Sequence, residues 1–124
     1  MSNLSELIQR GDWKSEKHVP IILVPQNVVK EEPFNITVSI GEEIPHPNTL
    51  EHHIKWIKVF YQPDSGKFPI EIATTVFDSH GESGIFTDYT ATIKFKASES
   101  GVLYALSYCN IHGLWQSQAD LKCK

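Results

Sequence analysis

The sequence predicts an all-β protein, an antiparallel β-sandwich of about seven strands preceded by a short helix. Two segments, residues 34–40 and 89–95, alternate apolar and polar side chains with a period of two. Such alternation is typical of strands that are buried on one face. Prolines and glycines divide the rest of the chain into short segments at similar intervals, which favours several short strands joined by turns.

The elements follow one another in a simple order. Asn3 and Glu6 have the spacing of a capping box, and Gly11 can end a helix, so residues 1–12 are predicted to form a helical N-terminal extension. The remainder of the chain is predicted to be strands and turns. The expected strands, in chain order, cover residues 18–24, 34–40, 52–61, 69–77, 89–95, 102–109 and 115–121.

Composition predicts a single domain over residues 1–124. A net charge of −4 argues against nucleic-acid and membrane-surface binding, which usually require a basic patch. No apolar run approaches the roughly 20 residues of a membrane span. No signal peptide is recognisable either, so a cytoplasmic location is expected. The two cysteines, Cys109 and Cys123, are then expected to be free thiols or metal ligands and not a disulfide.

Histidines are numerous, six in 124 residues, and four of them lie where predicted strands meet loops. His18 and His52 open strands, and His46 lies between two prolines. Cys109 and His112 are three residues apart, a spacing that lets a thiolate and an imidazole bind one metal ion across a tight turn. Because a sandwich gathers its loops at two ends, these side chains can converge there. The spacing therefore predicts a redox metal site with histidine and cysteine ligands.

Each of these residues also has an ordinary explanation. A single histidine is more often a surface or hydrogen-bonded residue than a ligand, and a free cysteine is often a small buried hydrophobe. His53 follows His52 directly, so the two point to opposite faces of a strand and cannot both enter one site. His80 lies in a turn without a ligand-type neighbour, and we exclude it as well.

The ligand types leave zinc, copper and iron open. Structural zinc usually belongs to small folds that depend on it, and this chain is long enough to fold without one. Blue copper would use His46, Cys109 and His112, but its axial ligand would have to be Gln116 or Gln118, because the only methionine is Met1. Iron uses all the histidines at strand ends. A cupredoxin-like electron carrier and a metal-bearing binding module without catalysis remain the alternatives to an enzyme.

Four segments resemble the signature blocks of the superoxide reductases of the one-iron type, also called neelaredoxins. The resemblance extends from about residue 11 to residue 115, with the blocks in the family's order and at its approximate spacing. Four blocks together are far more specific than any one of them. They are Glu16-Lys17-His18-Val19-Pro20, Ile44-Pro45-His46-Pro47-Asn48-Thr49, Glu51-His52-His53-Ile54 and Leu106-Ser107-Tyr108-Cys109-Asn110-Ile111-His112-Gly113-Leu114-Trp115.

This resemblance implies an immunoglobulin-like sandwich with one mononuclear, non-haem iron ion per chain in a square-pyramidal site. Glu16 matches the carboxylate that caps the sixth position in the resting ferric state, and Lys17 matches a lysine near the open face. Backbone N–H groups of residues 110–112 could hydrogen-bond the thiolate sulfur. The implied ligands are the equatorial His18, His46, His52 and His112, with Cys109 as the axial thiolate.

The activity implied by the resemblance is that of a superoxide reductase. Such an enzyme reduces superoxide by one electron to hydrogen peroxide and does not dismutate it to dioxygen. The implied partners are a rubredoxin-like electron donor and further copies of the chain in a homotetramer. The related desulfoferrodoxins add an N-terminal domain with a four-cysteine iron site, and this chain departs from them because no cysteine precedes Cys109. Residues 81–89 are also shorter than in the family pattern, and Cys123 matches no motif.

Overall fold

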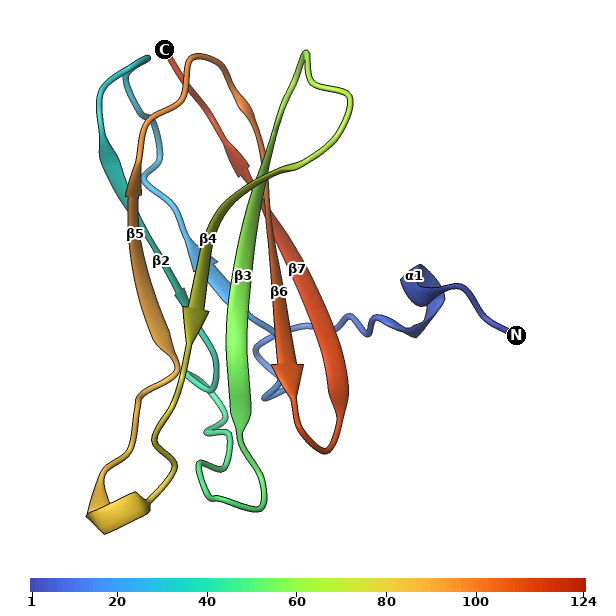
Figure 1. The fold of residues 1–124 in the computed structure, drawn as a ribbon. Helices are drawn as coiled ribbons and strands as arrows, with labels where there is room; N and C mark the ends of the chain where they lie inside the picture. Colours follow the sequence, from blue (N-terminus) through green and yellow to red (C-terminus); the bar gives the residue numbers. More distant parts are fainter.

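In a computed structural model of residues 1–124, seven strands form two antiparallel sheets that pack face to face (Figure 1). This arrangement confirms the expected immunoglobulin-like sandwich. The three-stranded sheet has the order β1 (Ile21–Leu23), β2 (Phe34–Ser39) and β5 (Thr90–Phe95). The four-stranded sheet has the order β4 (Ile70–Val76), β3 (Ile54–Pro63), β6 (Gly101–Cys109) and β7 (Gly113–Leu121).

The core lies between the sheets and follows from the alternation seen in the sequence. In the β2–β5 pair, Ile36 lies opposite Ile93 and Val38 opposite Ala91, and all four side chains are buried. In the other sheet, alternate residues of β6 are buried from Gly101 to Cys109. Period-two burial on both sheets brings two apolar faces together, and this contact is the main source of stability in a sandwich.

Two predicted elements differ from the structure. The N-terminal helix is a single turn, α1 (Leu4–Leu7), and Asn3 makes no side-chain capping bond to it. An isolated turn of helix is unstable without tertiary packing, and both Leu4 and Leu7 are exposed, so nothing extends the helix to Gly11. The first strand begins at Ile21 instead of His18, because Pro20 has no N–H to donate to a ladder. A short 3-10 helix, η1 (Glu82–Gly84), interrupts the β4–β5 connection.

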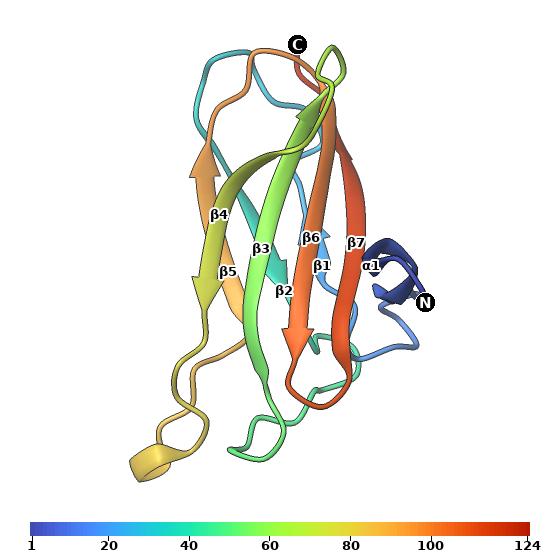
Figure 2. The ribbon, with the colours of Figure 1, turned by 45° about the vertical axis from the view of Figure 1, so that its right-hand side comes forward.

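The N-terminal segment is attached to the edge of the four-stranded sheet (Figures 1 and 2). Gln9 forms a parallel bridge with Trp115: the Gln9 N–H donates to the Leu114 carbonyl and the Gln116 N–H donates to the Gln9 carbonyl, each at 2.9 Å. The only α-helix is this four-residue turn, far too short to cross a bilayer.

Four chain segments meet at the lower end of the sandwich as drawn in Figure 2. They are the segment before β1 and the connections β2–β3, β4–β5 and β6–β7. The strand directions require this, because β2, β4 and β6 end there while β1, β3, β5 and β7 begin there. Each histidine and cysteine that the sequence places at the junctions of this end is therefore brought to one face of the protein.

Candidate metal centre

The five residues expected to bind a metal converge at this lower end. Cys109 is the last residue of β6, where it lies opposite Ile54 on one side and Gly113 on the other. His52 precedes β3 by two residues, and His112 lies in the turn between β6 and β7. The other two candidate ligands lie outside the strands, next to the three-stranded sheet. They are His18, three residues before β1, and His46, in the β2–β3 connection.

Their donor atoms face one common point. One ligand atom from each of His18, His46, His52 and Cys109 lies within 4.8 Å of all the others. The Cys109 Sγ is 3.6 Å from the His46 Nε2 and 3.9 Å from the His112 Nδ1. The His18 Nε2 lies 3.1 Å from the same His112 nitrogen. Two nitrogens bound at right angles to one ion, each about 2.1 Å away, would be about 3 Å apart, so the separation of the His18 and His112 nitrogens suits a shared metal.

Hydrogen bonds on the opposite side of two rings determine which nitrogen is free. The His18 Nδ1 is 2.7 Å from a Glu16 carboxylate oxygen, and the His46 Nδ1 is 2.7 Å from the Pro47 carbonyl. Both oxygens accept only, so each Nδ1 carries the proton and each Nε2 offers a lone pair to the site. Metal-binding histidines are usually held in this manner by their second nitrogen.

The His52 ring gives an independent test of whether a metal fits. Its Nε2 is buried and has no hydrogen-bond partner. A buried polar atom without a partner is costly and requires a reason, and a bound metal ion would supply the partner that the protein lacks. Four imidazoles and one thiolate are a donor set that iron accepts, so the residues present fit the ion that the sequence led us to expect.

Burial favours the neutral form of His18, His46 and His52. Loss of solvation lowers the pKa of His46 to about 4, and it also lowers the pKa of His18 and of His52. For His18 the hydrogen bond and charge of Glu16 act in the opposite direction, whereas neighbouring positive charges add to the lowering. A neutral imidazole is the form that binds metal, so these shifts leave the ligands ready near neutral pH.

The Cys109 sulfur is fully buried and accepts a hydrogen bond from the His112 N–H at 3.4 Å. This confirms, for His112, the expected backbone bond to sulfur. The Asn110 N–H instead donates to the His53 carbonyl, at 3.1 Å. Cys123 is also a free thiol, so the two cysteines form no disulfide.

Glu16 and Lys17 lie at the site in different ways. One Glu16 oxygen accepts both the His18 backbone N–H, at 3.1 Å, and its Nδ1–H. Although burial alone would raise the pKa of Glu16, these hydrogen bonds and the charge of Lys17 hold it below its ordinary value. The Lys17 charge also contributes to the lowered pKa of His18, His46 and His52, so its ammonium group acts on the cluster.

His53 and His80, which sequence reasoning set apart from the ligands, pack against each other. Their rings stack with centroids 3.7 Å apart, and both are buried. The His53 Nδ1 bonds the Thr49 carbonyl and the His80 Nδ1 bonds the Asn48 side chain. The bonds to Thr49 and Asn48 tie the stacked pair to the segment between His46 and His52, so both residues support the site without belonging to the group of candidate ligands.

Sequence reasoning missed two contacts of the ligands. Trp115 stacks on His18 with ring centroids 4.8 Å apart and planes within 10°, and its indole N–H donates to the His112 carbonyl. The Gln9 side chain donates to that same carbonyl, at 2.6 Å. Trp115 belongs to the fourth sequence block, which could have indicated a role, but no motif includes Gln9.

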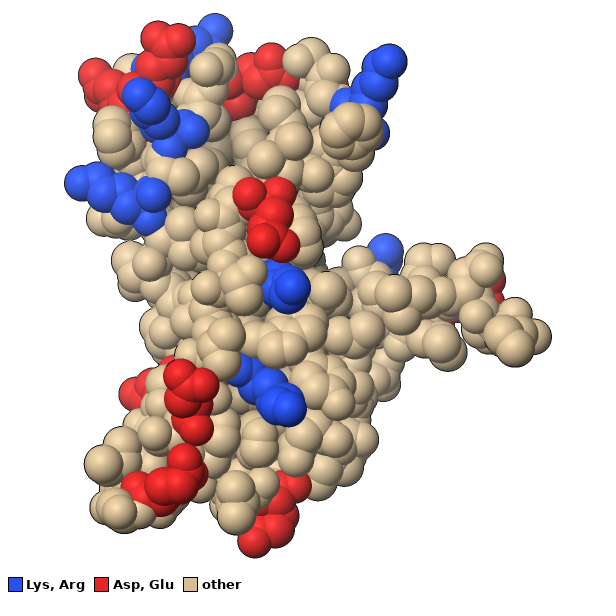
Figure 3. All heavy atoms as spheres, in the orientation of Figure 1, with Lys and Arg blue, Asp and Glu red and all other residues tan.

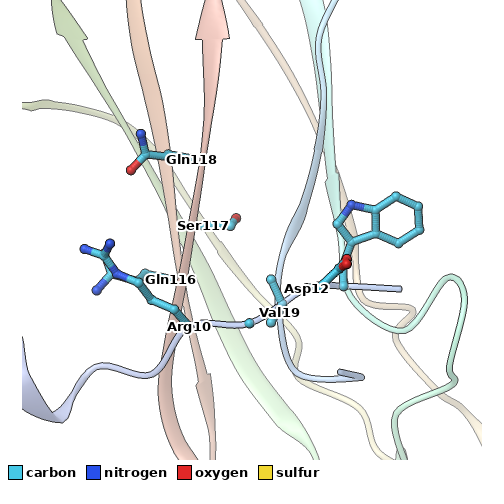
Figure 4. A pocket seen from close by; sticks show the side chains of 8 residues that line it. Arg10, Asp12, Val19, Gln116, Ser117 and Gln118 are labelled. Atoms are coloured by element: carbon cyan, nitrogen blue, oxygen red, sulfur yellow. The ribbon is translucent and has the colours of Figure 1, made fainter. Parts of the chain in front are cut away.

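The axial ligand that the copper alternative needs is absent from the site. Gln116 and Gln118, its candidate axial ligands, line a groove between β7 and the N-terminal segment together with Arg10 and Asp12 (Figure 4). Neither belongs to the group around Cys109. His18 and His52 also lie in this group, so the site holds more imidazoles than a blue-copper site would use.

Negative charge surrounds the centre. Acidic side chains gather at the lower end of the face shown in Figure 3. The β2–β3, β4–β5 and β6–β7 connections contain no lysine or arginine. They carry the exposed carboxylates of Glu42, Glu43, Glu51, Asp78, Glu82 and Asp88. The half-buried Lys17, on the segment before β1, therefore supplies positive charge where the loops supply none.

Comparison with known proteins agrees with this geometry. A family model described as desulfoferrodoxin matches residues 10–118. The superoxide reductase of Pyrococcus horikoshii is 49% identical over 96% of this chain and 99% of its own length, and the neelaredoxin of Megalodesulfovibrio gigas is 42% identical over 98% of each. The reduced superoxide reductase (neelaredoxin) structure from Archaeoglobus fulgidus superposes with a TM-score of 0.87, at 48% identity, over 94% of this chain and 98% of that one.

We expect the metal-free protein to lose stability as the pH falls from about 6.5 to about 4. The pKa of His46 is about 4 in the folded protein and 6.5 in an unfolded chain. Between these pH values the unfolded chain binds a proton at His46 and the folded chain does not, so lower pH favours unfolding. The stabilisation is complete above the higher value. At about 1.4 kcal/mol per pKa unit, His46 alone accounts for about 2 kcal/mol between about pH 6.5 and about pH 5.

Urea unfolding of the metal-free protein at about pH 6.5 and about pH 5 measures this difference in the free energy of unfolding. A His46→Gln protein should show a smaller decrease over the same interval. An equal decrease in both proteins would contradict the assignment to His46.

Proposed function

This chain belongs to the desulfoferrodoxin family, and we propose that it is a superoxide reductase of the one-iron type, acting as a single domain over residues 1–124. The observation that carries the proposal is the convergence of three imidazoles on the Cys109 thiol, joined by the His112 ring 3.9 Å from the sulfur, with a buried His52 nitrogen that lacks any protein partner. The reaction consumes one superoxide, one electron and two protons and yields one hydrogen peroxide, without formation of dioxygen.

The proposed ligands of one iron ion per chain are His18, His46, His52 and His112 with Cys109. When bound in its ferrous form, iron supplies the electron that reduces superoxide. Glu16 is a further candidate ligand. In the structure its carboxylate holds the His18 Nδ1–H, so it would have to release His18 in order to bind the metal.

The protein's own residues prepare the site in three ways. Burial favours the neutral form of His18 and His46, and the bonds from each Nδ1–H to Glu16 and Pro47 leave each Nε2 directed inward. The His112 N–H, by bonding the sulfur, disperses part of the negative charge of the Cys109 thiolate. His112 itself is exposed, so water reaches this side of the centre and can deliver the two protons that the product requires.

Lys17 is the proposed group that attracts the substrate. Superoxide is an anion, and both the net charge of −4 and the acidic loops repel it. Screening limits the effect of distant charges to about 8–10 Å at ordinary salt concentrations. The charge of Lys17 contributes to the lowered pKa of three proposed ligands, so it would attract the anion at short range.

Metal analysis and rapid mixing test the proposed function. We expect about one iron per chain in the purified protein, and fast oxidation of the reduced form by superoxide with peroxide as the product. Cys109→Ser should remove both the visible absorption from thiolate to iron and the activity, because a serine hydroxyl stays protonated where a thiol ionises.

The control is Cys123→Ser, which makes the same change at the free thiol outside the centre and should leave both properties intact. Copper or zinc in place of iron would refute the proposal. Retention of the absorption by Cys109→Ser would remove Cys109 from the site.

Lys17→Ala should slow the reaction with superoxide roughly tenfold at low ionic strength, and should flatten the dependence of the rate on salt. Lys30→Ala changes the net charge equally, and the charge of Lys30 contributes to no pKa shift of a proposed ligand, so its rate should stay near that of the wild type. Stopped-flow measurements over a range of salt concentrations compare the two variants. Equal rates for both variants at low salt would reject local steering by Lys17.

The family resemblance also supports proposals on partners and location. We propose that a rubredoxin-like carrier delivers the electron, that the protein is a homotetramer, and that it acts in the cytoplasm, where its two free thiols suit a reducing compartment. Reduced rubredoxin should be oxidised by the protein during superoxide turnover, and light scattering should give four times the mass of one chain. If rubredoxin is not oxidised, the proposed electron donor is wrong, and a different mass would contradict the tetramer. Recovery of the protein outside the cytoplasm on cell fractionation would contradict the proposed location.

A further inference from the structure

Tyr89 is a buried residue that contacts the ligand-bearing β2–β3 connection at three points. It lies immediately before β5, and 7% of its surface is exposed. Its backbone carbonyl accepts the Ile40 N–H at 3.0 Å, where the connection begins. Its hydroxyl donates to the Pro47 carbonyl at 2.8 Å, in the middle, and accepts the Ile54 N–H at 3.2 Å, where β3 begins.

The contact with Pro47 bears on His46. The same Pro47 carbonyl accepts the His46 Nδ1–H at 2.7 Å, so one oxygen receives both donors through its two lone pairs. Because the Tyr89 hydroxyl also bonds the Pro47 carbonyl, the direction of this carbonyl is fixed. The His46 imidazole that bonds the same oxygen therefore has a fixed orientation as well. The His46 Nε2 is thereby held 3.6 Å from the Cys109 Sγ.

The contact with Ile54 bears on His52. Ile54 begins β3 two residues after His52, and it lies opposite Cys109 in the β3–β6 pair. Its N–H is anchored on the Tyr89 hydroxyl, which fixes the chain where it turns from the His52 segment into the sheet. A tyrosine hydroxyl is protonated at neutral pH, so this group can donate to Pro47 and accept from Ile54 at the same time.

We propose that Tyr89 is a positioning residue of the iron centre, whose hydroxyl holds His46 and His52 at the separation that the metal requires. The inference rests on the proposed function, since it presumes that these histidines bind iron. It extends that function to a residue just before β5, in the sheet that does not contain Cys109, which binds neither the substrate nor the metal. Outer partners of metal ligands typically change metal affinity by 10- to 100-fold when removed.

The test replaces the hydroxyl and keeps the ring. Tyr89→Phe retains the contacts of the ring edge with His46 and Phe77, whose ring centroids lie 5.8 Å and 5.4 Å away. In the iron-loaded protein we expect it to lose iron to a competing chelator at about tenfold lower chelator concentration than the wild type. We also expect its thiolate-to-iron absorption band to shift, because the directions of His46 and His52 are no longer fixed.

A matched control is available in Tyr61. It is 5% exposed, and its hydroxyl donates to the Glu99 carbonyl at 2.6 Å, at the opposite end of the sandwich. Tyr61→Phe should lower the urea midpoint much as Tyr89→Phe does, yet leave iron affinity and the absorption band unchanged. Equal iron affinity and an unshifted band in Tyr89→Phe, or the same changes in Tyr61→Phe, would overturn the positioning role.

A second substitution covers the case in which Tyr89→Phe does not fold. Fluorotyrosine introduced at position 89 keeps the hydroxyl but makes it a stronger donor to Pro47 and a weaker acceptor from Ile54. Iron affinity or the absorption band should then change relative to fluorotyrosine at position 61, and identical values at both positions would refute the inference. A wild-type protein that binds no iron would overturn the proposed function itself, which distinguishes that failure from a failure of Tyr89 alone.

Discussion

The register of β6 against its two neighbours is the constraint on which the metal centre depends. Pairing with β3 places Cys109 opposite Ile54, two residues from His52, and pairing with β7 places it opposite Gly113, next to His112. A slip of one residue would turn Cys109 from the interior to the outer face of its sheet, since successive side chains of a strand point to opposite sides. The buried alternation of β6, with Leu103 and Ala105 in the core, opposes such a slip. The hydrophobic core thus sets the position of the thiol, and the thiol sets the centre of the site.

The imidazoles that surround this thiol create a cost that the fold partly offsets. Burial disfavours protonation of His18, His46 and His52, and the second nitrogens of His18 and His46 are satisfied by Glu16 and Pro47, so little rearrangement is needed for binding. The His52 Nε2 is the exception, because it is buried and has no partner within the protein. Such a site trades stability of the metal-free chain for preorganisation. The contacts that limit this cost come from both sheets, through the Tyr89 hydroxyl, the stack of His53 on His80, and the stack of Trp115 on His18.

Sequence reasoning reached the parts of the structure that local pattern encodes. The alternation in residues 34–40 and 89–95 predicted β2 and β5 almost to their ends, and the histidines at strand–loop junctions predicted which side chains would meet. It failed at the N-terminal helix, because a capping-box spacing says nothing of whether Leu4 and Leu7 find a surface to pack on. It also failed for Gln9 and Tyr89, whose partners lie 103 and 42 residues away in the chain. Contacts of this kind depend on which strands become neighbours, and no periodicity records that.

Charge at the lower end of the sandwich acts over two distances. The six carboxylates of the loops are exposed, so salt screens their field and weakens the repulsion they exert on an approaching anion. Lys17 is half-buried beside the imidazoles, where the lower dielectric makes its charge more effective and screening less so. If Lys17 acts as proposed, an anion meets weak repulsion at a distance and attraction close to the centre. The proposed attraction of a small anion to the centre thus depends on one lysine next to loops that carry only negative charge.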